Sequence, residues 1–103
     1  MTLPLSSRSP VPPEVSTELQ RVVQRWRQLL LDHALTCAGR VRALIQSLAD
    51  QVAQATGVRP SAVPDCGPAT LMDQLTVMVY DASAAALTST LAGDLAGLRR
   101  ELS

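Results

Sequence analysis

Residues 19–55 read LQRVVQRWRQLLLDHALTCAGRVRALIQSLADQVAQA and carry a long apolar stripe. The stripe residues follow one another at steps of three or four, about 3.6 on average, which is the period of an α-helix. They are Leu19, Val22, Trp26, Leu30, His33, Cys37, Val41, Leu44, Leu48, Val52 and Ala55. The sequence therefore predicts one nearly straight amphipathic helix with a single apolar face.

Signals at both ends of this stretch predict that the helix covers residues 13–56. Pro13 suits the first helical position, because its missing N–H would have no partner there. Gly57 suits the left-handed position after a helix end, and Pro60 follows soon after. Gly39 is the interior position at which the helix could break. Since the stripe keeps its phase across Gly39, we expect a continuous helix.

A second helix is predicted over residues 68–102, after a connector of residues 57–67 that contains two prolines and two glycines. Thr70 and Asp73 form an alternative capping pair at its start. The apolar residues of its two halves point roughly opposite ways: Leu71, Leu75, Met78, Ala82 and Ala86, then Leu87, Leu91, Leu95, Leu98 and Leu102.

Two alternatives remain for this second segment. The helix could break near Thr88-Ser89-Thr90, but no proline enforces a break there, so we expect one helix. Residues 75–80 contain threonine and two valines and could form a short strand. A lone strand would lack a pairing partner in an otherwise helical chain, which favours the helix.

The length of the first predicted helix has a consequence for assembly. Residues 13–56 would span about 65 Å, whereas a compact chain of 100 residues has a radius of gyration near 13 Å. One short chain cannot cover such a rod, so we expect an all-α two-helix hairpin that forms a homodimer, an antiparallel four-helix bundle. The predicted interface consists of Trp26, Leu31, Leu35, Leu87, Leu91, Leu95 and Leu98.

Composition is consistent with this class. The chain has 103 residues, of which 47% are hydrophobic, 17% charged and only 2% aromatic. A core of leucine, valine and alanine suits close helix packing better than a β-sandwich. Residues 1–12 are rich in proline and serine and predict a flexible tail before a single helical domain over residues 13–103.

The formal net charge is zero, which removes the usual electrostatic argument for nucleic acid or an anionic membrane as partner. The sequence has no run of about 18 apolar residues. Its first residues also lack the basic and apolar regions of a signal peptide. We therefore expect a cytoplasmic protein.

Candidate chemistry is limited to three residues. His33 and Cys37 lie four residues apart on one helix face, and a symmetric dimer could bring together two of each as zinc ligands. The interpretation we favour is that both belong to the apolar stripe, so that no metal or cofactor is expected. Cys66 precedes a helix start, but the sequence offers no second histidine as a base. We therefore expect no enzyme activity.

The function predicted from the sequence is a non-catalytic helical interaction or assembly module that self-associates. One alternative is a small regulatory protein that binds another macromolecule or DNA. The other is a helical bundle that holds a metal or small ligand near His33 and Cys37.

Overall fold

The computed structural model describes residues 9–102, and the remaining part of the predicted tail, residues 1–8, lies outside them. The described chain is helical without strands, which confirms the predicted fold class. The helices are α1 (Pro13–Gln28), α2 (Leu31–Thr56), a short 3-10 helix η2 (Pro68–Thr70), α3 (Leu71–Ala84) and α4 (Leu91–Glu101). The two-helix hairpin is therefore wrong, because each of the two predicted helices is split into two α-helices.

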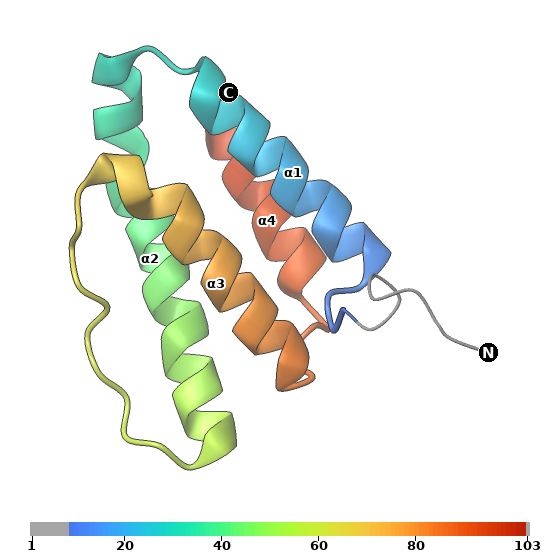
Figure 1. Cartoon of the computed structure of the whole chain (residues 1–103). Coiled ribbons are helices and arrows are strands. Elements are labelled where there is room, and N and C mark those ends of the chain that lie inside the picture. Colours follow the sequence, from blue (N-terminus) through green and yellow to red (C-terminus); the bar gives the residue numbers. More distant parts are fainter. Residues whose placement is uncertain (1–8, 103) are drawn as a thin grey trace.

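The four α-helices form two pairs. Figure 1 shows α1 beside α4 and α2 beside α3, and within each pair the helices run in the same direction. The chain therefore runs up, down, down and up. The radius of gyration is 14.1 Å, close to the value of about 13 Å expected for a compact domain of this size. Splitting the long helices lets one chain cover its own apolar faces.

The first predicted helix breaks at Leu29 and Leu30, not at Gly39. Both residues have extended backbones, with φ/ψ of −73°/141° at Leu29 and −65°/150° at Leu30. We call these two residues the hinge. Gly39 lies within α2 and is exposed.

The spacing of the residues that pack in the core explains this break. In α1 the steps are 4, 3, 4 and 3, through Val15, Leu19, Val22, Trp26 and Leu29. In α2 the same steps connect Ala34, Ala38, Val41, Ile45 and Leu48. The step from the first series to the second is five residues, which no single face of a continuous helix provides. The predicted stripe included Leu30 and His33, and the structure places both at the surface.

The second predicted helix breaks at residues 85–90, close to the Thr88-Ser89-Thr90 alternative. Ala86 adopts a left-handed backbone with φ of 61°. The amide of Leu87 donates to the carbonyl of Ala82 at 2.9 Å, and the amide of Ala86 donates to the carbonyl of Ser83 at 3.0 Å. This is the hydrogen-bond pattern of a Schellman motif, formed here around alanine instead of glycine.

Other boundaries follow the sequence signals in part. The first helix begins at Pro13, as predicted, and α2 ends before Gly57, whose φ is 75°. Thr70 makes no capping bond to the start of α3, so the predicted Thr70–Asp73 pair is wrong. Its hydroxyl instead donates to the carbonyl of Gly67 at 3.0 Å. Before α1, Val11 is half-buried against the core.

The connector of residues 57–67 runs lengthwise along α2, because α2 and α3 point the same way and the chain must return to start α3 (Figure 1). Gln46 fixes its middle by donating to the carbonyl of Ser61 at 3.1 Å and accepting from the amide of Val63 at 2.8 Å. Gln74 donates to the carbonyl of Pro64 at 2.9 Å. These bonds tie the connector to both helices of one pair.

Candidate interaction surface

Three exposed leucines lie at the hinge or within the first turns of α2. Leu30 is 82% exposed, Leu31 69% and Leu35 52%. Of the other large exposed hydrophobic residues within 9–102, Val58 lies in the connector, and Val77 and Tyr80 form a pair three residues apart on α3. Single exposed apolar residues are ordinary on a protein surface, whereas a cluster marks a contact site or an aggregation liability.

One of these leucines, Leu31, lines a groove of about 620 Å³. Side chains of α1, the hinge, α2, η2 and α3 form its apolar wall, namely Trp26, Leu29, Leu31, Ala34, Pro68, Ala69 and Met72. Arg27 and Asp73 supply its charges. We call the groove together with Leu30, Leu31 and Leu35 the hinge surface. It combines protruding leucines with an adjacent hollow, which are the two complementary shapes of a packed contact.

The residues predicted for a dimer interface are placed in two different environments. Leu91, Leu95 and Leu98 are buried in the core of their own chain, and Leu87 is half-buried against it. The three residues of α4 pack mainly on α1, because α4 folds back after the break at residues 85–90. Leu31 and Leu35 are exposed, and the half-buried Trp26 lines the groove. The part of the predicted interface that stays accessible therefore belongs to the hinge surface.

A second groove lies between the end of α2, the connector and α3. Its volume is about 450 Å³, and its apolar wall includes Val52, Val58, Val63 and Met78. Of these four side chains only Val58 is exposed. The hinge surface therefore offers more apolar area to a partner.

Within one chain, the candidate metal ligands His33 and Cys37 lie side by side without further ligands from residues 9–102. The Sγ of Cys37 lies 3.7 Å from Nε2 of His33, with Cys37 buried and His33 exposed. Among residues 9–102, no group of three or more His, Cys, Asp and Glu residues is arranged to hold a metal ion. Cys66 is exposed in the connector. The prediction that Cys37 is a core residue is confirmed, whereas His33 lies outside the core.

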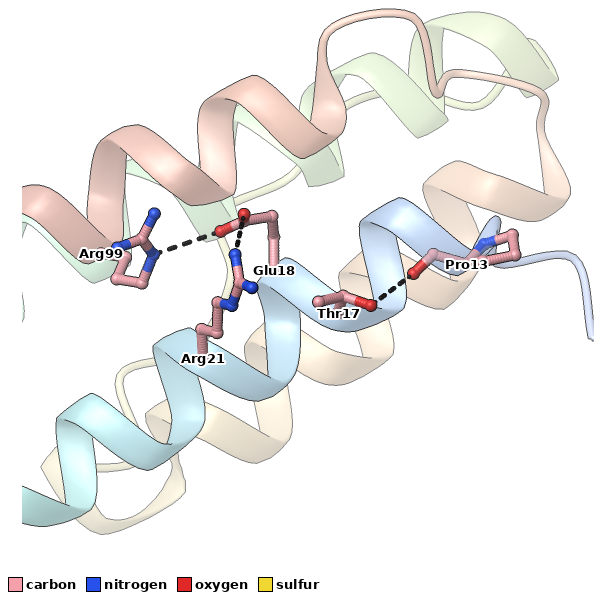
Figure 2. A network of polar contacts seen from close by, with 5 residues as sticks. All are labelled: Pro13, Thr17, Glu18, Arg21 and Arg99. Carbon is pink, nitrogen blue, oxygen red and sulfur yellow. Dashed lines mark hydrogen bonds and ion pairs between the residues drawn. The ribbon is translucent and has the colours of Figure 1, made fainter.

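Many of the arginines make contacts within the chain. Glu18 accepts from Arg21 at 2.9 Å and from Arg99 of α4 at 3.2 Å (Figure 2). The first of these contacts is the helix-surface pair expected at a spacing of three residues. Arg25 donates to the backbone carbonyl of Leu102 at 3.2 Å. The contacts of Arg99 and Arg25 hold α1 against α4, so these two arginines have a structural role in positioning that pair, whereas the contact of Arg21 lies within α1.

Arg40 and Glu101 join α2 to α4 through two hydrogen bonds, one of 2.7 Å from Nη2 of Arg40 to Oε1 of Glu101. This hydrogen bonding, together with the charge of Arg40, lowers the pKa of Glu101 from its ordinary value. A lowered folded-state pKa means that the contribution to stability is complete above the unfolded-state pKa and is lost as the pH falls through the folded-state pKa.

This gives a pH-dependent prediction. We expect wild type to be more stable than Glu101→Gln at neutral pH, by a small amount because the pair is exposed. The difference in free energy of unfolding between the two proteins should disappear as the pH falls below the ordinary pKa range of a glutamate. Urea unfolding of both proteins from pH 7 into the acid range measures it. A difference that stays constant with pH would show that Glu101 contributes through packing and not through its charge.

Within residues 9–102, no helix has the length and hydropathy that a bilayer span requires. Comparisons with protein-family models, curated proteins and solved structures gave no significant match.

Proposed function

We propose that this chain is a non-catalytic helical interaction module that self-associates through its hinge surface. The observation that carries the proposal is the exposure of Leu30, Leu31 and Leu35, of which Leu31 lines an apolar groove. Fully burying one leucine side chain contributes roughly 1.5–3 kcal/mol. Covering the three leucines therefore supplies a substantial driving force for association.

The charges at the groove favour a second copy as partner. Arg27 and Asp73 both line the groove, and neither takes part in an ion pair between described residues. A two-fold contact places the same surface on both sides, so that a positive group of one copy can face a negative group of the other. The hinge surface carries a positive and a negative side chain, and it has both protruding leucines and a hollow. Two copies of this surface can therefore complement each other in charge and in shape.

Leu35→Glu tests the proposal. We expect this change to weaken self-association by at least about tenfold, because a carboxylate replaces an apolar contact worth about 1.4 kcal/mol or more. Leu35 is about half exposed, so the folded monomer should keep its helical content. Light scattering after size exclusion over a range of protein concentrations measures the dissociation constant.

Val77→Glu is the matched control. Val77 is 53% exposed on α3, almost the same as Leu35 on α2, and it lies outside the hinge surface. We expect Val77→Glu to associate like wild type. If both variants weaken association equally, or if wild type is monomeric at every concentration, the hinge surface is not where the chain associates.

A further inference from the structure

The break between α1 and α2 is not enforced by the local sequence. Leucine is among the better helix formers, and the hinge contains neither proline nor glycine. The hinge is extended because α1 packs on α4 while α2 packs on α3. Tertiary contacts within one chain therefore oppose a local preference for helix.

Most of the contacts that hold α1 in place are made with α4. Both side-chain hydrogen bonds that leave α1 in the described chain go to α4 or to Leu102 just after it: Arg99 donates to Glu18, and Arg25 donates to the carbonyl of Leu102. The core residues Val15 and Val22 share one cluster with Leu91, Leu95 and Leu98. An α1 helix from another copy can make every one of these contacts.

If Leu29 and Leu30 become helical, α1 and α2 merge into one helix over residues 13–56. That helix would be about 65 Å long, whereas the longest extent of the folded chain is 49 Å. The merged helix cannot bring α1 back to α4 of its own chain. Another copy of the chain is the partner that restores the lost contacts.

Merging the helices also changes the environment of the hinge. In a continuous helix, Leu30 lies in line with Trp26, His33 and Cys37, which are spaced at steps of three and four. If two such helices related by a two-fold axis cross near this point, Leu30, which is 82% exposed in the single chain, lies at the contact between them.

We propose that two copies exchange α1 and form a domain-swapped dimer, in which the hinge is helical and α1 of each chain packs on α4 of the other. The proposal rests on the proposed function, since it specifies how the self-association occurs. Exchange of an identical element is a low-cost route to a dimer, because the swapped contacts already exist in the monomer.

Leu30→Pro and Leu30→Ala separate this mechanism from simple docking of hinge surfaces. The backbone of Leu30, with φ of −65°, already fits proline, as does the extended backbone of Leu29 before it. Proline in the middle of the merged helix should raise the dimer dissociation constant by at least about 100-fold. Alanine keeps the helix preference, and Leu30→Ala should still dimerise.

Cross-linking identifies the swap directly. In a background with Cys37→Ala and Cys66→Ser, chains with Glu18→Cys and chains with Arg99→Cys are unfolded together, refolded at high concentration and treated with a short bis-maleimide. We expect a covalent heterodimer, because residue 18 of one chain lies beside residue 99 of the other. Chains with Gln20→Cys, an exposed position of α1, replace the Glu18→Cys chains in the control and should cross-link less.

The outcomes distinguish the two proposals. A dimer that persists in Leu30→Pro and gives no cross-link above the control would overturn the swap and leave association through the hinge surface intact. A wild-type chain that is monomeric at every concentration would overturn the proposed self-association and the swap with it. Circular dichroism of Leu30→Pro confirms that a loss of dimer is not a loss of fold.

Discussion

Leu95→Ala is expected to lower the free energy of unfolding of the monomer by about 2–5 kcal/mol, because it removes a fully buried side chain and leaves a cavity. Leu95 is 0% exposed in α4, within the cluster that also contains Val22 of α1 and Leu75 of α3. A small domain has a total stability of about 5–15 kcal/mol, so this one change removes a large share of it. Urea denaturation at a concentration where the chain is monomeric measures the effect.

Leu31→Ala is the control, since it makes the same chemical change at an exposed position. We expect its free energy of unfolding to stay within about 0.5 kcal/mol of wild type. The sequence alone placed Leu31 and Leu95 together at a dimer interface. If that were their environment, both variants would alter association and neither would destabilise the monomer. Equal and small effects on monomer stability would contradict the buried position of Leu95.

The helical class could be predicted because it depends on local features. Leucine, valine and alanine recur at helical spacing, and Pro13 and Gly57 mark a helix start and a helix end in the structure as they do in the sequence. The packing of four helices in one chain could not be predicted in the same way. It depends on which faces meet, and a stripe with a mean period near 3.6 can be drawn through Leu30 although the core bypasses that residue.

The two breaks differ in what the sequence shows. At the hinge, the five-residue step from Leu29 to Ala34 separates two series of apolar residues that are each spaced at three and four. The predicted stripe ran through Leu30 and His33 instead and therefore missed this step. After α3, the left-handed residue is Ala86, for which glycine would be the expected signal. The change of apolar face after Ala86 was the available indication of a break, but it also fitted one helix buried on both sides, and one continuous helix was the prediction.

Only part of the hinge surface could be predicted from the sequence. Leu31 and Leu35 lie off the apolar stripe whether or not the helix is continuous, so the sequence identified them as residues in need of cover. The groove beside them combines Trp26 and Leu29 with Pro68 and Met72, which are distant in sequence. Only the placement of α3 against α2 brings these residues together.

Gly39→Pro is expected to lower the free energy of unfolding by at least about 2 kcal/mol. Proline is about 3 kcal/mol less favourable than alanine inside a helix, and the glycine it replaces is already about 1 kcal/mol less favourable. The ring also clashes with the preceding turn and removes an amide donor. Gly39→Ala should instead raise the free energy of unfolding by about 0.5–1 kcal/mol, since a Cβ at this position meets nothing within 4 Å.

Leu30→Pro completes the comparison, because it places the same residue type at the observed break. The amide of Leu30 donates no hydrogen bond to any residue within 9–102, and its backbone already has the angles of proline. A proline in a compatible conformation restricts the unfolded chain, so the monomer should gain about 0.4–1 kcal/mol. If the monomer had a continuous helix over residues 13–56, both Leu30→Pro and Gly39→Pro would lower its free energy of unfolding. Opposite signs at positions 30 and 39, measured by urea unfolding, therefore locate the break at the hinge and leave the exposed leucines beside it as the surface available to a partner.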